Sequence, residues 1–476
     1  MRDRIAEVVA EVLNEITPSR QRRAEISAVA KKLEDRVASA CKKQGVEAAI
    51  RVEGSVAKDT WLTDEPDVDV FMRVSTKIPR ESLGKTCLKV ARKATEGSKQ
   101  VERFAEHPYL EAFMNEVRVN IVPCYDVKRG DWHSATDRTP YHTDYIRKCL
   151  SKQLQGEVRL LKKFMKGIGV YGAEIKVGGF SGYLCELLAL HYGGFVDVLK
   201  AFARHRQRII VDIEGHYKGR ENEIELLFKE PLVIVDPVDR GRNVASAVQA
   251  QKLHNFMAAT RAFLNKPDRR FFYPLRAIAL SLEEFRKRLA ERGPAIVAVG
   301  FDQVEAVPDI LWGQLYKSQR SLHKLVELND FHVLRDLAWS DEKTACMFIF
   351  ELEDCCIPPA KKHAGPPLDK EHECEDFLAK HLGKSGTVAG PYIEDGRWVV
   401  QLRRKYTDAC ALLRERLKDG GKRAGVAEGI AQKLRKGFRV LVNEEITETY
   451  GKNSEFAVFL TEFLSGRPTW LEAVET

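Results

Sequence analysis

The dipeptide Gly54-Ser55, followed twelve residues later by Asp67-Val68-Asp69, decides the fold of this chain. Strand-like residues precede the Gly-Ser turn and surround the two acids. Because alternate side chains of a strand point to the same face, Asp67 and Asp69 share one face of the predicted strand. Neighbouring carboxylates repel each other unless a cation joins them, and Mg²⁺ prefers oxygen ligands. The pair therefore predicts a magnesium site.

The Gly-Ser turn predicts a phosphate site beside that metal. Gly54 lets the backbone approach a phosphate closely, and Ser55 can donate its hydroxyl and its N–H at the start of a short predicted helix, Val56–Thr60. A helix N-terminus favours anions, and Lys58 adds a cation one turn in. Two metal ions can clamp an attacking hydroxyl and a leaving pyrophosphate. The layout therefore indicates nucleotidyl transfer.

Length and composition restrict the class of protein. With 476 residues, 44% apolar and 31% charged, the chain is expected to be soluble and to have about two to four domains. No apolar run is long enough to span a bilayer, and the N-terminus lacks a signal-peptide pattern. The 10 cysteines are scattered, which predicts free thiols in a reducing cytoplasm. One group could be drawn as a zinc site, although its spacing fits no standard knuckle: Cys355, Cys356, His363, His372 and Cys374.

Positive charge is concentrated in the last part of the chain. The net charge is +8, and residues 401–439 hold twelve Lys/Arg against four Asp/Glu, which gives +8 in that window alone. The rest of the chain is therefore close to neutral. A localised basic surface indicates a polyanionic partner, and a solvated helical face is the alternative.

Residues 1–140 carry the pattern of a compact α/β module. Two helices are predicted within residues 1–45, broken at Thr17-Pro18. Strands are predicted at Val46–Glu53, Val68–Val74 and Val117–Pro123, with a helix at Pro79–Ala94.

The rest of the chain divides into three further predicted parts. Residues 144–264 are mostly helical, and a β-α-β-β pattern that begins near Pro267 indicates a split α/β sandwich. Pro358–Pro367 is predicted to be a linker or loop, followed by a basic, largely helical segment. The expected fold is multidomain α/β, with a catalytic head over 1–140, a helical neck over 141–264, an α/β body over 265–368 and a basic tail over 369–476.

Several motifs carry a family resemblance. The Gly-Ser and Asp-Val-Asp elements, with the strand end Val122-Pro123-Cys124-Tyr125, resemble the DNA polymerase β-type nucleotidyltransferase superfamily. Other stretches resemble its archaeal (class I) CCA-adding enzymes: Asp137–His142, Leu160-Leu161-Lys162, Tyr171–Glu174, Gly179–Glu186, Asp236–Asp239, Arg242–Ala245 and His363–Pro367. Together these matches run from about residue 50 to 400 and are more specific than a lone pair of aspartates.

This resemblance implies a fold, a reaction and a set of binding residues. The family has a polymerase β-like head, a helical neck, an α/β body and a tail, often as a homodimer. It builds the CCA end of tRNA from CTP and ATP without a nucleic-acid template. By motif position, the triphosphate contacts are Ser55 and Lys58, the Mg²⁺ ligands are Asp67 and Asp69, the further nucleotide contacts are His142, Lys162 and Tyr171, and the base-reading residue is Arg242.

One position departs from the family pattern. The superfamily normally has a third carboxylate three residues before Pro123, and here that residue is Asn120. An amide oxygen can ligate magnesium weakly but cannot act as a base. Asn120 is therefore expected to be the third catalytic and metal-binding residue. We expect it to weaken the binding of the ion that activates the 3′ hydroxyl. Of the nearest acids, Asp126 and Glu116, the latter is about 13 Å away along an extended strand.

Two alternatives to a CCA-adding enzyme stay open. One is a poly(A) polymerase-like nucleotidyltransferase, which would add only adenylate. The other is a catalytically weak or inactive tRNA-binding relative, because Asn120 replaces the third carboxylate.

Overall fold

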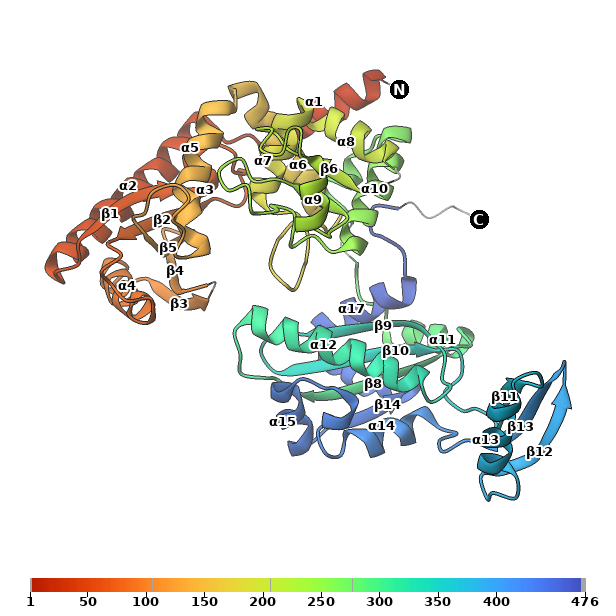
Figure 1. Cartoon of the computed structure of the whole chain (residues 1–476). Helices are drawn as coiled ribbons and strands as arrows, with labels where there is room; N and C mark the ends of the chain where they lie inside the picture. The colour runs from red at the N-terminus through yellow and green to blue at the C-terminus, as the bar shows by residue number, and fades with distance from the viewer. Residues whose placement is uncertain (1, 105, 206, 276, 472–476) are drawn as a thin grey trace. The chain divides into compact units, whose positions relative to one another are not determined.

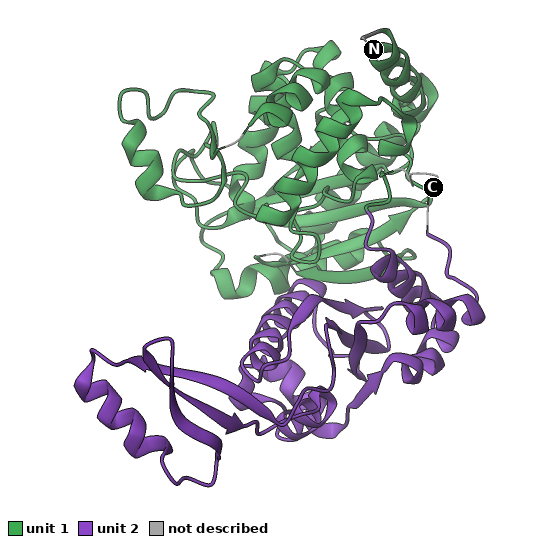
Figure 2. Cartoon of the chain, turned by 90° about the vertical axis from the view of Figure 1, so that its right-hand side faces the viewer, with its two compact units in different colours: residues 1–276, 468–476 green, residues 277–467 purple. Residues whose placement is uncertain are grey.

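The chain forms two compact units (Figure 2). The computed structural model describes residues 2–104, 106–205, 207–275 and 277–471. Unit 1 consists of residues 1–276 with 468–476, and unit 2 consists of residues 277–467.

A five-stranded sheet in unit 1 has the strand order β1-β2-β5-β4-β3 (Figure 1). Strand β2 pairs in parallel with β5, and the other neighbours are antiparallel. The bounds are Ala48–Glu53 (β1), Asp67–Val74 (β2), Lys99–Phe104 (β3), Pro108–Met114 (β4) and Val117–Tyr125 (β5). The three predicted strands are confirmed, and the sheet has two more, β3 and β4, that the sequence patterns did not predict.

Helices α2 (Arg20–Lys43) and α4 (Arg80–Ala94) cover one face of this sheet. Val68 of β2 is fully buried in the same core cluster as Leu33 of α2 and Leu83 of α4. Because neighbouring residues of a strand point to opposite faces, Asp67 and Asp69 lie on the other face. The predicted orientation of the two acids is confirmed.

The two predicted helices at the N-terminus, broken at Thr17-Pro18, are also confirmed. Helix α1 spans Arg2–Ile16, and α2 begins after Pro18. Ser19 caps α2, and its hydroxyl accepts the Arg22 N–H at 3.1 Å. Such a cap satisfies one of the backbone donors that a helix start leaves without an intrahelical partner.

The helical part of unit 1 packs around phenylalanine rings. Phe164 meets Phe195 and Phe263 edge to face, with ring centroids 5.6 and 5.5 Å apart. Phe271 stacks on Trp470 at 5.6 Å, so a residue near the end of the chain completes this core. The remaining elements of unit 1 are α3 (Gly54–Ala57), the 3₁₀ turns η1 (Ala135–Arg138) and η2 (Arg269–Phe271), α5 (Thr139–Cys149), α6 (Lys152–Gly167), α7 (Gly182–Tyr192), α8 (Phe195–Arg204), β6 (Ile209–Val211), α9 (Glu221–Leu227), β7 (Leu232–Ile234) and α10 (Ala250–Asn265).

Unit 2 contains an antiparallel sheet of order β14-β8-β10-β9. The predicted β-α-β-β pattern is confirmed as β8 (Ala295–Asp302), α12 (Pro308–Glu327), β9 (Val333–Ser340) and β10 (Ala345–Leu352). The other elements around this sheet are α11 (Leu282–Glu291), α14 (Ala409–Leu417), η3 (Lys422–Ala424), α15 (Glu428–Lys436), β14 (Arg439–Val442), η4 (Asn443–Ile446), α16 (Thr447–Lys452) and α17 (Ser454–Ser465).

A second sheet of unit 2 corrects one prediction. The predicted loop Pro358–Pro367 is wrong over most of its length, because Ala360–Pro367 forms β11, an edge strand of the order β11-β13-β12. Prolines are tolerated there because an edge strand leaves one row of backbone groups unpaired. The segment that follows contains helices as predicted, beginning with α13 (Glu371–His381), but it also contains strands. These are β12 (Thr387–Glu394), β13 (Arg397–Arg403) and β14, which returns to the larger sheet.

The predicted four-part division at residues 140, 264 and 368 stays a prediction. Unit 1 contains both the predicted head and the predicted neck. Among the described residues, no helix has the length and apolar character needed to cross a membrane.

Candidate active site

The three predicted metal ligands lie side by side on the sheet of unit 1. In the parallel pair β2 and β5, Asp69 stands opposite Asn120 and Asp67 stands opposite Arg118. The Asn120 amide donates to Asp69 Oδ1 at 2.9 Å. Arg118 Nε donates to Asp67 Oδ1 at 2.6 Å, and its Nη2 contacts the other oxygen. The structure therefore brings both acids and Asn120 together, with a guanidinium on Asp67 that the sequence did not predict.

The Gly-Ser turn is shaped around one of these acids. Gly54 has φ +70°, and a Cβ on this residue would lie 2.1 Å from Asp69 Oδ2. Only glycine fits there, because it adopts this backbone conformation readily and leaves the space to the carboxylate. Ser55 follows in the first turn of α3 and is partly exposed.

The donor set suits a hard divalent cation. Burial raises the pKa of Asp69 to about 6, while the Asn120 hydrogen bond and the charge of Lys58 act in the opposite direction. Arg118 forms an ion pair with Asp67, so a positive group lies against this carboxylate as a bound ion would. Among the described residues, no three His, Cys, Asp or Glu side chains gather closely enough to hold a metal by themselves. Two carboxylates and an amide oxygen leave positions for water and phosphate oxygens, as Mg²⁺ sites do.

Two predicted nucleotide-binding residues, Lys58 and Lys162, contact the same buried acid. Glu186 of α7 is fully buried, and its Oε2 lies 2.5 Å from Lys58 Nζ. Its Oε1 lies 3.3 Å from Lys162 Nζ and accepts the Thr60 hydroxyl at 2.6 Å. Burial by itself would raise the pKa of Glu186, yet the two ammonium groups hold it below its usual value. Burial lowers the pKa of Lys162, and Glu186 opposes this shift.

The acid that fixes these lysines was not among the predicted site residues. Glu186 lies in the Gly179–Glu186 motif, to which no binding role was assigned. One signal was present, because a glutamate at position 186 interrupts an apolar run in α7 whose neighbours are all buried. A charge in such a place must be paired, since an isolated buried charge is strongly unfavourable.

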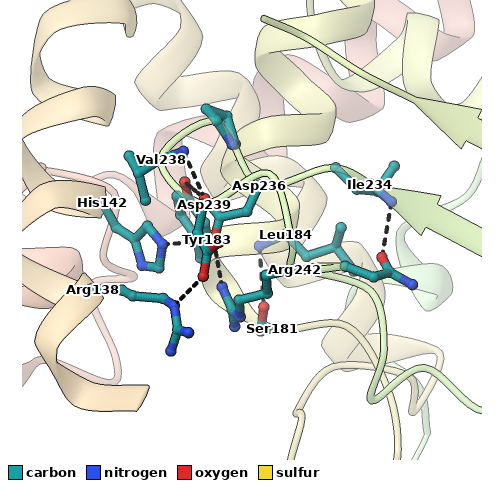
Figure 3. Close-up of polar contacts among 12 residues, drawn as sticks. Arg138, His142, Ser181, Tyr183, Leu184, Ile234, Asp236, Val238, Asp239 and Arg242 are labelled. Carbon is teal, nitrogen blue, oxygen red and sulfur yellow. Dashed lines mark hydrogen bonds and ion pairs between the residues drawn. The ribbon is translucent and has the colours of Figure 1, made fainter. Parts of the chain in front are cut away.

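Two further predicted residues, His142 and Arg242, bind a second buried acid (Figure 3). His142 Nε2 lies 2.8 Å from Asp236 Oδ2, and Arg242 Nη1 lies 2.8 Å from the same oxygen. Asp236 Oδ1 accepts the Val238 N–H at 3.0 Å and the Tyr183 hydroxyl at 3.3 Å. Burial would raise the pKa of Asp236, but its hydrogen bonds, first that of His142, lower the value to about 2. Burial also lowers the pKa of His142, which favours the neutral ring at pH 7.

Tyr183 and Lys58 connect these groups. The Tyr183 ring stacks on His142 with centroids 4.1 Å apart, and Lys58 Nζ lies 5.8 Å from the Tyr183 centroid. Tyr171, the remaining predicted contact, is partly exposed, with Lys166 Nζ 5.2 Å from its ring centroid. Burial raises the pKa of Tyr171, and the charges of Glu186 and Asp67 add to the shift. A chain of contacts in unit 1 therefore joins the buried acid Glu186, through Lys58 and Tyr183, to Asp236 and Arg242.

The acid pair and these nucleotide-binding residues suit one kind of chemistry. Adjacent carboxylates can hold cations on a phosphate group, the Gly-Ser turn leaves room beside them, and Arg242, 37% exposed, offers a planar fork for a base edge. In such a site catalysis comes from positioning and charge stabilisation.

Three family models match the chain in order. Residues 34–153 match a nucleotidyltransferase domain, 156–273 match the second domain of tRNA nucleotidyltransferases, and 292–443 match the C-terminal domain of CCA-adding enzymes. The first match covers the strands that carry the acids. The predicted multidomain α/β fold with a polymerase β-like head is confirmed.

Archaeal relatives match over nearly the whole chain. The CCA-adding enzyme of Methanosarcina mazei is 36% identical over 456 residues, covering 95% of this chain and 97% of the relative. Those of Methanothermobacter thermautotrophicus and Pyrobaculum islandicum are 35% and 36% identical, and cover 89% and 87% of this chain and 90% and 94% of their own length. The expected family is thereby confirmed: the chain belongs to the archaeal CCA-adding enzymes, which are nucleotidyltransferases.

Proposed function

We propose that this chain adds or repairs the 3′-terminal CCA of tRNA, using CTP and ATP without a nucleic-acid template. The observation that carries the proposal is the acid pair on β2, which Gly54 approaches closely. The consecutive segments of the chain also match the domains of tRNA nucleotidyltransferases and CCA-adding enzymes. In the reaction, the 3′ hydroxyl of the tRNA attacks the α-phosphate of the nucleotide, and pyrophosphate leaves.

The metal ligands of the proposal are Asp67, Asp69 and Asn120. Nucleotidyltransferases of this superfamily use divalent metal ions, and we assign Mg²⁺ here because the donors are hard oxygen atoms. When bound, the ions would neutralise charge on the triphosphate and on the attacking hydroxyl. Asn120 would have to turn its amide so that the oxygen faces the ion, because its nitrogen now donates to Asp69.

The nucleotide ligands of the proposal divide into two groups. Ser55, Lys58, Lys162 and Tyr171 are assigned to the triphosphate and ribose, and the contacts of Lys58 with Glu186 and Tyr183 keep its ammonium near the acids. His142 and Arg242 are assigned to the base, since Asp236 fixes both side chains. A neutral imidazole can both donate and accept a hydrogen bond, which suits a base edge.

The acceptor arm of tRNA is assigned to the basic surface of unit 2. The window 401–439 includes exposed Lys418, Lys422, Arg423 and Lys436. Duplex RNA is recognised mainly through its shape and phosphates. The family resemblance further suggests a homodimer, and sedimentation would measure the oligomeric state. The ten free cysteines favour a reducing compartment such as the cytoplasm.

Single-nucleotide incorporation tests the proposal. The full chain is incubated with tRNA that lacks its terminal CCA, and with labelled CTP alone, ATP alone or both. Addition of two cytidylates followed by one adenylate is the expected result. Tailing by ATP alone would favour a poly(A) polymerase-like enzyme, and tight tRNA binding without any incorporation would favour an inactive relative.

A further inference from the structure

Arg242 lies on a closed turn that follows β7, residues 235–243, here called the Arg242 turn. An isolated antiparallel bridge joins its two ends, and the Asp236 N–H donates to the Arg242 carbonyl at 3.0 Å. Nearer the tip, the Asp239 carbonyl accepts the Arg242 N–H, also at 3.0 Å. The turn is therefore bonded within itself, and a group that holds Asp239 also restrains the backbone of Arg242.

Arg138, at the end of η1, binds the side chain of Asp239 (Figure 3). Its Nε donates to Asp239 Oδ2 at 2.7 Å, and the two side chains are only 20% and 17% exposed. The guanidinium also lies 5.5 Å from the centroid of the Trp132 ring. The other oxygen of Asp239 accepts the Gly241 N–H at 3.2 Å. This charge-assisted bond therefore reaches the turn through a side chain that is itself bonded to the turn.

A second arginine of the same stretch holds the tip of the turn. Arg129 Nη2 donates to the Pro237 carbonyl at 2.6 Å, and its Nε donates to the Val238 carbonyl at 3.1 Å. His142 adds the contact with Asp236 that is described above. Three side chains from the stretch between β5 and the first turns of α5 therefore reach the Arg242 turn.

That stretch is fixed in its turn to the strand of Asn120. Asp137 is 1% exposed, and its Oδ1 accepts the N–H of Tyr125, the last residue of β5, at 2.8 Å. Its Oδ2 accepts the Ser134 N–H at 2.7 Å. One buried carboxylate therefore ties the end of β5 to the start of η1. Through Asp137 and its neighbour Arg138, bonds connect β5 to the turn.

These bonds fix the spacing between two parts of the proposed site. The acids on β2 are assigned to the ions on the triphosphate, and Arg242 is assigned to the base. A nucleotide that spans both is placed correctly only if their separation is fixed. The contact of Arg242 with Asp236 lies within the turn and cannot set this separation. It must be set by side chains outside the turn, and the two arginines are among them.

We propose, on the basis of the proposed function, that Arg138 is a positioning residue that sets the selectivity of the enzyme for the nucleotide base. Through Asp239 it holds Arg242 at a fixed distance from β5, so that a base matching the planar guanidinium brings its α-phosphate to the ions. Without Arg138 the turn keeps its own bonds but can shift relative to β5. A wrong pyrimidine is then accepted more readily, while the triphosphate still binds.

Discrimination between CTP and UTP tests this role, with tripolyphosphate as a ligand that has no base. Calorimetry with Mg²⁺ gives the affinity of the full chain for all three, and kcat/KM for each nucleotide is measured on tRNA that lacks its terminal CCA. We expect Arg138→Gln to lower the preference for CTP over UTP at least about tenfold in both measurements. The affinity for tripolyphosphate should stay as in wild type.

A double-mutant cycle shows through which residue Arg138 acts. In an Arg242→Gln background, Arg138→Gln should change the preference little, because both substitutions remove the same reading of the base. Arg138→Lys, which keeps a donor for Asp239, should restore most of the preference. Asp239→Asn should reproduce the loss, so the test does not depend on one variant.

A purely structural ion pair would give a different pattern. An unchanged preference in Arg138→Gln would overturn the role, and so would a parallel loss of affinity for CTP, UTP and tripolyphosphate. Arg73→Gln is the matched control, because it removes a partly buried pair with Asp126 at the start of the same stretch and should leave the preference unchanged. A wild-type chain that prefers CTP in binding but adds no nucleotide to tRNA would contradict the proposed function and not the role of Arg138.

Discussion

The side-chain amide of Asn120 donates a hydrogen bond of 2.9 Å to Asp69, so the residue beside this acid is a donor and not a second anion. The proposed metal site therefore has one negative charge fewer on β5 than an aspartate at position 120 would give it. The affinity of this site for a second metal ion should depend on the acidic side chain that lies nearest.

Asn120→Asp should raise turnover at limiting Mg²⁺ by roughly tenfold, because the introduced carboxylate attracts the ion and can accept a proton. The advantage should shrink in Mn²⁺, which nitrogen and oxygen ligands bind more tightly than Mg²⁺. Initial rates of CCA addition across a series of both metals provide the measurement. Equal rates throughout would refute the idea that Asn120 limits the enzyme, and Asn115→Asp, at an exposed turn, is the charge control.

Gly54→Ala should abolish most activity, since its new methyl group would lie 2.1 Å from Asp69 Oδ2 and would displace that ligand. Misplacement of a catalytic group by about 1 Å commonly reduces the rate about a hundredfold. Gly45→Ala is the matched control, because Gly45 also has positive φ and its added Cβ meets nothing within 4 Å. Both variants should lose a similar amount of stability, about 1–2 kcal/mol, and normal activity of Gly54→Ala would contradict this description of the turn.

Glu186→Gln should destabilise unit 1 by about 3 kcal/mol or more, because it leaves the ammonium groups of Lys58 and Lys162 buried without their counter-charge. Urea unfolding followed by tryptophan fluorescence would record the change. Glu7→Gln, which removes an exposed ion pair with Arg4, should leave the midpoint of urea unfolding unchanged. A midpoint shift in Glu186→Gln no larger than this control would show that the lysines are not buried as described.

Acidification should selectively remove the contribution of Asp236 to the free energy of unfolding. Its pKa is about 2 in the folded chain against 3.8 as the ordinary value, so the unfolded state binds the proton first. The contribution, about 2 kcal/mol, is complete above pH 4 and disappears as the pH falls through 2. Unfolding free energies of wild type and Asp236→Asn should therefore differ at pH 7 and converge as the pH falls below about 2. A difference that grows on acidification would reverse the assigned sign, and Asp197→Asn at an exposed pair with Lys200 is the control.

Neutralising the basic surface of unit 2 should weaken tRNA binding and reduce its salt dependence. The combined change of Lys418, Lys422, Arg423 and Lys436 to Gln should lower the slope of log K against log salt by about 0.7–0.9 for each RNA phosphate that the variant no longer neutralises. Lys42→Gln with Lys43→Gln provides an exposed control in unit 1.

Substitution is a sounder test of this surface than removal of the segment. A truncation before Gln401 would also remove Leu412, Ile430 and Val440, which belong to the core of unit 2. An unchanged slope in the fourfold variant would place the tRNA elsewhere.

Much of the metal site could be predicted from the sequence because its signals are local. The alternation of Val68 and Val70 with two acids specifies both a strand and its polar face within a few residues. The strand order could not be obtained in this way. Strand β4, Pro108–Met114, reads Pro-Tyr-Leu-Glu-Ala-Phe-Met and lacks a regular alternation of apolar and polar residues, so its place beside β5 was not predicted.

The buried partners of the binding residues could not be predicted from sequence patterns, for a different reason. Lys58 and Glu186 are 128 positions apart, and only the packing of α7 near α3 brings their charges together. Propensity and periodicity describe short windows, whereas such a pair is decided by tertiary contacts. Asp236 is the intermediate case, since its loop motif was visible but its partners His142 and Arg242 were not.

The stacking of Trp470 on Phe271 has a consequence for synthesis of the chain. Domains generally fold in order as they leave the ribosome, but the aromatic core of unit 1 includes a residue translated after all of unit 2. Unit 1 therefore cannot reach its final packing until all of unit 2 has been translated. A nascent chain released early would carry the acid pair and the nucleotide-binding residues with an open aromatic core, which exposes it to proteases before it can act on RNA.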